Sequence, residues 1–184
     1  MALSDTADDF ELRLAVESAA RWIDDYCGRF FYRATQTRTF EPRDFYNCDI
    51  DDLVSVTTLK TDAGGDGVYE TTWSASDYQL LPIGAPFYAE PRPYTALKTV
   101  GGLMFPRVWW SFMRHTDLVQ IAGVYGWPRI PSPVKQAQLL LAADLFKLKG
   151  APFGVANMGD FAMRIRDNNR VISLLQPFAP TPVG

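Results

Sequence analysis

Residues 118–150 read LVQIAGVYGWPRIPSPVKQAQLLLAADLFKLKG, and this stretch decides the fold class. Its first part predicts a strand, and residues 126–131 follow as a stiff, extended linker that holds two prolines. Ser132 then supplies an N-cap and Pro133 a first helical residue, so we expect a helix that ends at Gly150. A strand followed directly by a long helix predicts a fold that contains both kinds of element.

The helix predicted after Ser132 is apolar on nearly every side. One face holds apolar residues at steps of three and four: Val134, Ala137, Leu141, Leu145 and Leu148. Much of the remaining surface is covered by Leu139, Leu140, Ala143 and Phe146. A helix of this kind is buried on two sides. In a chain of 184 residues, we expect the second side to face a neighbouring subunit.

A second helix is predicted near the N-terminus, from about Asp8 to Cys27. Apolar residues recur there at steps of three and four on a face that we expect to be buried: Leu12, Val16, Ala19, Ile23 and Tyr26. Charged residues of alternating sign occupy another face, and Gly28 is placed to end the helix.

The region between the two helices, from about Thr35 to Gly126, predicts antiparallel β structure. The strongest strand signal is Leu53–Thr61, and the glycine-rich residues 63–67 turn the chain back into Tyr69–Trp73 as a hairpin. Further strands are expected at Thr35–Phe40, Tyr78–Leu81 and Ala96–Val100. Residues 82–93 hold four prolines and predict an irregular loop at a surface or an interface.

The C-terminal residues 151–184 predict an extended arm. A short helix is expected through Val171–Leu175, and prolines keep the following residues extended. Leu174, Leu175 and Phe178 have little local core to cover them. We therefore expect the arm to dock on another protein.

The net charge of the chain favours a protein over nucleic acid as the partner of this arm. The chain carries a net charge of −3, whereas a protein that grips nucleic acid over its whole surface is strongly basic. Brief contact with passing DNA is compatible with this charge, because a mildly acidic wall lets a duplex slide. The basic residues near the tail, Arg164, Arg166 and Arg170, are expected to contact acidic groups of a protein in preference to DNA phosphates.

These elements together predict an α+β fold with an N-terminal helix, a small central antiparallel β region with long loops, a second buried helix, and an extended C-terminal arm with a short helix. We divide the chain into a helix–β–helix core, residues 1–150, and an arm, residues 151–184.

Cys27 in the first helix and Cys48 in a polar loop are expected to be free thiols. The chain shows no signal-peptide pattern and no membrane-length apolar run, so we expect a soluble protein made in the cytoplasm, without a membrane partner.

Catalytic and metal-binding patterns are weak throughout the sequence. The one histidine, His115, has no cysteine or carboxylate at ligand spacing and no accompanying nucleophile motif. Oxygen ligands alternate through Asp44, Asn47, Asp49, Asp51 and Asp52. This cluster lacks the glycine and the closing glutamate of a calcium loop, so we predict a solvated acidic loop. We expect no catalytic residue, metal or cofactor, and a small hydrolase is the least favoured function.

Three segments of the chain follow one another in a recognisable order. Residues 23–31 read IDDYCGRFF, close to an I-D-x-x-C-G-R-x-F pattern at the end of a first helix, and residues 119–128 read VQIAGVYGWP, a strand that ends in G-x-(F/Y)-G-W. An Ala/Leu-rich helix follows, and residues 171–178 form a short segment with L-L-x-P-(Y/F). This series resembles the head-to-tail connector (adaptor) proteins of tailed bacteriophages, in particular those of actinobacterial phages.

The resemblance implies a structural protein of the virion neck and no enzymatic activity. Connectors of this family assemble beneath the portal as a homo-oligomeric ring, usually of twelve copies, and extend the channel through which DNA is ejected. The implied partners are further copies of the chain, the portal protein, a stopper or tail-terminator protein, and double-stranded DNA that passes without sequence-specific binding. A stopper or tail-terminator ring protein is the alternative role within the same particle.

Two sets of site residues follow from these expectations. The portal-binding set lies in the arm: Arg164, Arg166, Arg170, Leu174, Leu175 and Phe178. The subunit-interface set combines the second side of the helix after Ser132 with an aromatic pair: Leu139, Leu140, Ala143, Phe146, Trp109 and Trp110. The aromatic pair belongs to residues 87–116, a segment that is longer and more aromatic than the resemblance predicts.

Overall fold

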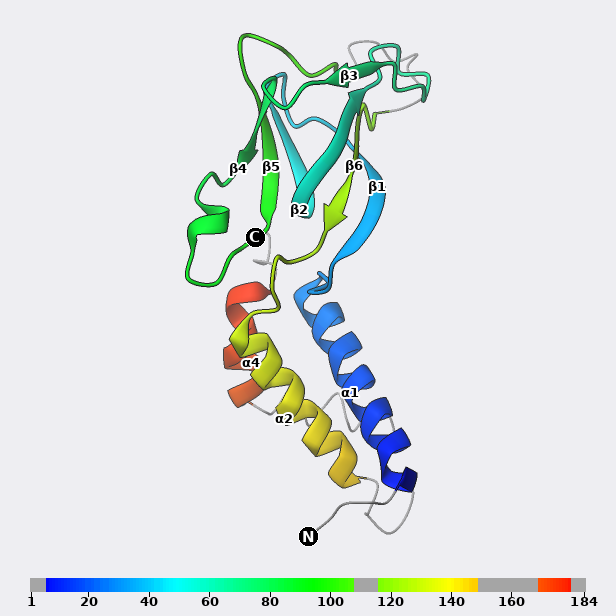
Figure 1. Cartoon of the computed structure of the whole chain (residues 1–184), viewed down its shortest axis with the longest axis vertical. Coiled ribbons are helices and arrows are strands. Elements are labelled where there is room, and N and C mark those ends of the chain that lie inside the picture. The colour runs from blue at the N-terminus through cyan, green and yellow to red at the C-terminus, as the bar shows by residue number, and fades with distance from the viewer. Residues whose placement is uncertain (1–5, 108–115, 149–168, 180–184) are drawn as a thin grey trace. The chain divides into compact units, whose positions relative to one another are not determined.

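The computed structural model describes residues 6–107, 116–148 and 169–179, and its elements are drawn in Figure 1. The chain divides into two compact units. A β unit comprises Phe31–Arg129, and a helical unit comprises Met1–Phe30 together with Ile130–Gly184. The chain therefore leaves the helical unit after its first helix and returns to it before the second.

The helical unit is built from α1 (Thr6–Cys27), α2 (Ser132–Leu148) and α4 (Asn169–Leu175), followed by a 3-10 turn, η2 (Gln176–Phe178). Helices α1 and α2 pack against each other and run in opposite directions, and α4 packs against α2 (Figure 1). The predicted helices at these three places are confirmed.

Helix α1 buries a stripe of small and medium side chains: Ala15, Ala19, Ile23 and Cys27. A spacing of four residues places them on one face, and the alanines let the two helices come close together. The predicted face was wrong in part, because Leu12 is exposed and Val16 and Tyr26 are only half-buried. The prediction favoured large side chains, whereas small ones decide how closely two helices pack.

Helix α2 buries the first part of the face that its spacing predicted, and Leu145 further along is half-buried. Val134, Ala137 and Leu141 are buried there. The side-chain amide of Gln138 donates to the carbonyl oxygen of Val16 at 3.3 Å. This bond sets the position of α2 along the axis of α1. On α4, Val171 and Leu175 are fully buried. The division predicted between residues 150 and 151 falls outside the described residues and stays a prediction.

The β unit holds a six-stranded sheet in which the described pairings are antiparallel. Its strands are β1 (Ala34–Phe40), β2 (Asn47–Thr61), β3 (Thr71–Trp73), β4 (Tyr78–Leu81), β5 (Tyr94–Thr99) and β6 (Val119–Tyr125). The order is β1-β6-β2-β5-β4, and β3 pairs with the end of β2. The α+β fold with a central antiparallel region is therefore confirmed.

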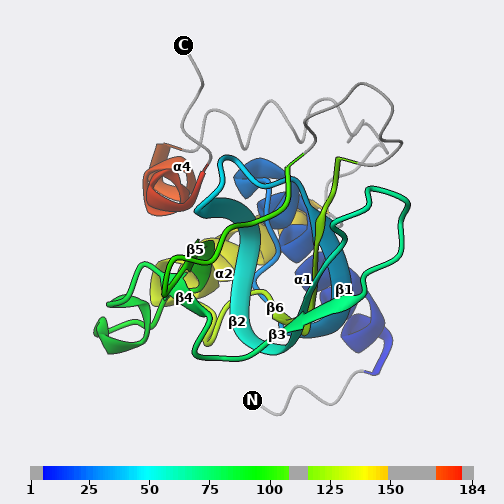
Figure 2. The same cartoon turned by 90° about the horizontal axis from the view of Figure 1, so that it is seen from above.

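The long strand β2 pairs with β5 through its first part and with β6 through its second. Register shifts in both pairings mark bulges, which bend a strand and increase its twist. Figure 2 shows β2 curving as it passes its neighbours. One face of the sheet carries the core, to which β6 contributes Val119, Ile121 and Tyr125, and β2 contributes Leu53 and Leu59.

Strand β2 begins at Asn47 rather than at Leu53, so the polar acidic loop predicted there was wrong. Acidic residues alternate along this part of the strand with the buried residues Cys48, Ile50 and Leu53. Acidic residues disfavour strands, but alternation leaves them on the outer face, where they stay hydrated. Cys48 is therefore a core residue, and both cysteines are free thiols as predicted.

The pattern that ends in Gly126-Trp127 has a structural explanation in the packing of β6 against β2. A Cβ atom on Gly123 would lie 2.3 Å from the carbonyl oxygen of Ser55, so no larger residue fits at this crossing. Gly126 has a φ of +101°, a conformation that favours glycine, and its N–H donates to the carbonyl oxygen of Asp52 at 2.8 Å. The indole of Trp127 is buried beside the ring of Phe31, with 5.4 Å between centroids.

Candidate interaction surfaces

The outer side of α2 carries apolar side chains that the helical unit leaves uncovered. Leu139 is 69% exposed, Ala143 is exposed, and Leu140 is half-buried between them. Phe146, one turn further on, is half-buried. These are the α2 residues of the predicted subunit-interface set, and their contact with another subunit stays a prediction.

A matching apolar patch on α1 was missed by the sequence analysis. Phe10 is 71% exposed and Leu14 is 54% exposed, and they lie one turn apart on the side of α1 away from the buried stripe. The signal was present in the sequence, because two large apolar residues at a spacing of four mark a second face. It was overlooked because only one face of this helix was expected to be buried.

The predicted portal-binding set divides into buried and accessible members. Leu175 is fully buried within the helical unit, whereas Leu174 and Phe178 are half-buried and Arg170 is exposed. Leu175 therefore has a core role that the sequence analysis did not foresee. The remaining predicted site residues, Arg164, Arg166, Trp109 and Trp110, and also His115, lie outside the described residues.

The loop between β4 and β5 presents an exposed aromatic residue on a hydrogen-bonded turn. A 3-10 turn, η1 (Ala85–Phe87), is closed by backbone hydrogen bonds from Ala85 to Pro82 and from Phe87 to Gly84. Phe87 is 85% exposed. The guanidinium of Arg92 lies over the ring of the neighbouring Tyr88, with its central carbon 5.0 Å from the ring centroid. The irregular surface loop predicted over residues 82–93 is confirmed as an exposed segment between two strands.

A groove of about 490 Å³ lies at the β3 end of the sheet. Its apolar part includes Trp73, Leu103, Met104 and Phe105. The rings of Trp73 and Phe105 stack with 5.1 Å between centroids, and the indole of Trp73 donates to the hydroxyl of Thr61 at 3.0 Å. These contacts fix the floor of the groove as part of the core.

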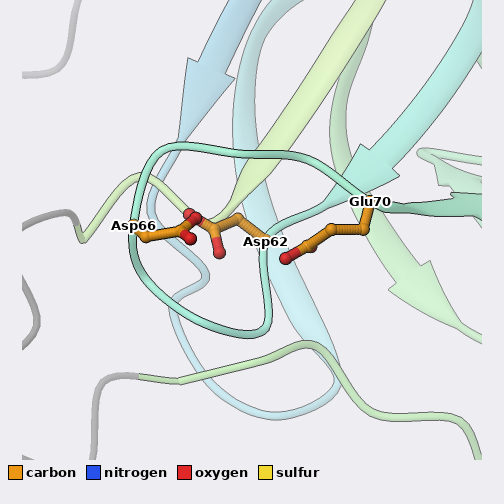
Figure 3. A group of neighbouring side chains, drawn as sticks. All are labelled: Asp62, Asp66 and Glu70. Atoms are coloured by element: carbon orange, nitrogen blue, oxygen red, sulfur yellow. The ribbon is translucent and has the colours of Figure 1, made fainter.

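Three acidic residues around the β2–β3 turn could offer oxygen ligands to a cation. Carboxylate oxygens of Asp62, Asp66 and Glu70 lie within 4.8 Å of one another (Figure 3). Asp62 is buried, and its two oxygens accept the backbone N–H groups of Gly65 and Gly67 at 2.6 and 2.7 Å. Asp62 therefore serves to hold the hairpin turn that the sequence predicted at residues 63–67.

The acidic residues near the start of β2 have partners within the protein. Asp44 accepts hydrogen bonds from the side-chain amide and backbone of Asn47 and from the backbone of Tyr46, and these bonds lower its pKa. Asp49 lies 3.3 Å from Arg43 and Asp51 lies 2.6 Å from Arg38. These contacts support a structural role for the cluster in place of the predicted solvated loop.

The guanidinium of Arg38 joins the outer face of the sheet to its core. It donates to Gln36 as well as to Asp51, and its central carbon lies 4.7 Å from the centroid of the Tyr125 ring. Burial raises the pKa of the Tyr125 hydroxyl, which donates to the carbonyl oxygen of Ile121 at 3.1 Å. The Tyr125 hydroxyl is thus held as a neutral hydrogen-bond donor in the core.

Burial also governs the two thiols. It raises the pKa of Cys27 to about 11, with Arg29 opposing the shift, and raises the pKa of Cys48 to about 12. Both side chains are therefore protonated at neutral pH, and a thiol in this form is a poor nucleophile and a poor metal ligand.

In the described part of the chain, no helix has the length and apolar character needed to cross a membrane.

Comparison with known proteins finds similarity in structure and none in sequence families. No protein-family model and no curated protein matches the sequence. A chain of a solved structure, the neck of an empty gene transfer agent (GTA) particle computed with C6 symmetry, matches with a TM-score of 0.61 at 21% identity. The match covers 100% of the present chain and 85% of the GTA chain.

Two further structures extend this likeness. A chain in the neck of the native GTA particle, computed with C12 symmetry, matches with a TM-score of 0.57 at 19% identity over 98% of the present chain and 85% of its own length. A chain in the virion of the native GTA particle matches with a TM-score of 0.50 at 21% identity, over 100% and 82%. At these identities the likeness establishes a common fold, and it does so over both units of the chain.

Proposed function

We propose that the chain is a structural subunit of the neck of a tailed, phage-like particle and acts there as the head-to-tail connector (adaptor). The observation that carries the proposal is the full-length likeness to a chain from a GTA neck. Because the likeness covers 100% of the chain, it includes the insertion of the β unit between α1 and α2 in the chain order. A small sheet shared by chance would not extend over both units.

The proposed assembly is a closed ring beneath the portal. The necks that contain the similar chains were computed with C6 and C12 symmetry, and a ring of twelve copies is compatible with both. Cyclic rings use two different surfaces of each subunit. The exposed neighbours Phe10 and Leu14 on α1, and Leu139 on the outer side of α2, support the presence of two such surfaces, because neighbouring apolar side chains that stay open to water mark interaction sites.

The proposed partners follow from the place of a connector. We propose that residues 151–184 form the arm that binds the portal, with Arg170, Leu174 and Phe178 as its accessible described contacts. The opposite side of the ring would present the docking surface for a stopper or tail-terminator protein. Double-stranded DNA would pass through the channel without sequence-specific contacts, in keeping with a net charge of −3.

Location within the particle tests this proposal. Particles that lack the chain should contain filled heads without attached tails, and the wild-type chain supplied in trans should restore tail attachment. In the complete particle, electron cryomicroscopy should place the chain in a ring that touches the portal. A position at the end of the tail tube, or between the connector and the tail, would instead identify a tail-terminator or a stopper. A chain found outside the neck would overturn the proposal.

A further inference from the structure

We propose that neighbouring copies of the chain bind one another through two outer faces of the helical unit. The α1 outer patch, Phe10 and Leu14, of one copy would pack on the α2 outer patch, Leu139, Leu140 and Ala143, of the next copy. This inference rests on the proposed ring and names the surfaces that close it.

The two patches lie on opposite sides of one pair of helices. Residues advance by about 100° each around a helix. Phe10 and Leu14 consequently lie roughly opposite the buried stripe of α1, which includes Ala19 and Ile23. The same reasoning places Ala143 roughly opposite Ala137 and Leu141, which α2 buries. Each patch therefore faces away from the partner helix of its own copy.

The two patches also lie at the same height along the helix pair. The hydrogen bond from Gln138 to Val16 marks a common level, and the helices run in opposite directions from it (Figure 1). At a rise of about 1.5 Å per residue, Leu14 and Phe10 lie about 3 and 9 Å from this level along α1. Leu139, Leu140 and Ala143 lie about 1.5 to 7.5 Å from it along α2, in the same direction. A copy that is rotated without being shifted along the helices therefore brings apolar surface against apolar surface.

This arrangement produces a ring in preference to a closed dimer. A dimer with two-fold symmetry pairs a surface with itself, whereas two different patches on opposite sides pair head to tail. Repeating such a contact by rotation alone adds copies until the circle closes. Opposite charges also stand near the patches at one level, since the exposed Glu17 of α1 and Lys135 of α2 lie within one turn of Val16 and Gln138. The occupant that fits each patch is thus a second copy of the chain.

Cysteine cross-linking in assembled particles tests the contact. We would introduce Leu14→Cys and Leu139→Cys together, since a disulfide forms only between Cα atoms about 4.4–6.8 Å apart. The native thiols are buried and do not compete. Mild oxidation should yield a ladder of covalent dimers, trimers and larger multimers of the chain, and each single variant should yield none. Multimers that stop at the dimer, or no multimers from particles whose necks hold the ring, would overturn the proposed contact.

Charge exchange provides a second test that does not depend on disulfide geometry. Leu14→Glu and Leu139→Lys should each lower incorporation of the chain into necks about tenfold or more, because each variant buries an unpaired charge at the contact. The double variant places the introduced carboxylate of one copy beside the introduced ammonium group of the next and should recover most of the incorporation. Val68→Glu, which changes an exposed apolar residue in the β unit, should have no effect. Equal loss in the single and double variants would count against the contact.

The two proposals fail in different ways. If the wild-type chain occupies a ring in the neck and neither the ladder nor the charge recovery is seen, the helical contact is wrong and the connector assignment stands. If the wild-type chain is absent from the neck, the connector assignment fails whatever the cross-links show. Thermal melting of each purified variant, compared with the wild type, separates loss of assembly from loss of folding.

Discussion

The indole N–H of Trp127 donates to a carboxylate oxygen of Asp52 at 2.9 Å and joins the end of β6 to the middle of β2. The Trp127 side chain is 4% exposed, so water has little room to replace Asp52 as the acceptor for its N–H. Asp52→Ala should leave this donor without its partner and lower the free energy of unfolding by about 1–3 kcal/mol. Chemical denaturation of the purified protein measures the change.

The matched control for this prediction is Asp51→Ala. Asp51 belongs to the same strand and pairs with Arg38, but its side chain is exposed, so its loss should cost less than about 1 kcal/mol. Trp127→Phe removes the same hydrogen bond from the other side. In combination with Asp52→Ala it should therefore cost less than the sum of the two single changes. Simple addition of the two effects would show that the bond does not couple these residues.

Gly123 should tolerate no side chain. Alanine at this position would bring its Cβ to 2.3 Å from the backbone oxygen of Ser55, which cannot move without breaking the pairing of β6 with β2. Gly123→Ala should lower the free energy of unfolding by about 3 kcal/mol. Gly84→Ala is the control, because Gly84 has a φ of −76° and nothing within 4 Å of an added Cβ. A loss of equal size in both variants would refute the argument from close packing.

The two native thiols should resist alkylation in the folded protein. Burial raises the pKa of Cys27 to about 11 and that of Cys48 to about 12, so the reactive thiolate is scarce at neutral pH and shielded from reagents. Iodoacetamide followed by mass spectrometry should find both unmodified until denaturant unfolds the chain. Lys98→Cys, at an exposed position on β5, should react readily under the same conditions and serves as the positive control.

Asp44 should make stability depend on pH in the acid range. Its hydrogen bonds with Asn47 and Tyr46 hold its folded pKa below the unfolded value of 3.8. A depressed pKa adds stability that is present above the unfolded value and is lost as the pH falls through the folded value. Thermal melts from neutral pH down to below the folded pKa should therefore show a smaller acid-dependent loss for Asp44→Asn than for the wild type. Identical slopes would show that Asp44 gains nothing from these bonds in folding.

The accessible residues of the C-terminal segment provide a test of portal attachment. Arg170→Glu reverses an exposed charge and should weaken attachment of the chain to portal-containing heads about tenfold, because an acidic partner surface would repel it. Lys98→Glu reverses an exposed charge on β5 and should have no effect on attachment. Point changes suit this experiment better than truncation, since Val171 and Leu175 belong to the core. Unaltered attachment of the Arg170 variant would count against this residue as a portal contact.

Much of the architecture followed from local patterns in the sequence. Ser132 and Pro133 marked the start of α2, and the glycines of residues 63–67 marked the β2–β3 turn. The bulges that bend β2 were not predictable, because they arise from pairing with two different strands. The early start of β2 was missed for a similar reason: the alternation of Cys48 and Ile50 with acidic residues becomes informative only when β5 lies alongside.

The interaction surfaces were predicted less completely than the fold. The exposed side of α2 followed from an excess of apolar residues such as Leu139, whereas Phe10 on α1 was missed because its helix already had one plausible buried face. Leu175 was assigned to a partner although α4 packs on α2, since no local pattern reveals that a short distant helix completes a core. Tertiary packing decides such cases, and periodicity alone does not.

The chain crosses between its two units at only two places, after Phe30 and before Ile130, so the β unit is an insertion within the helical framework. Inserted units of this kind diverge, or are exchanged, with little disturbance to the framework that carries them. In the proposed ring, selection could therefore remodel the surface that the inserted sheet offers to the next component of the particle, while the helices proposed to join the copies stay constant. Necks of dissimilar particles would then share a ring built from the same helices, while their inserted sheets differ.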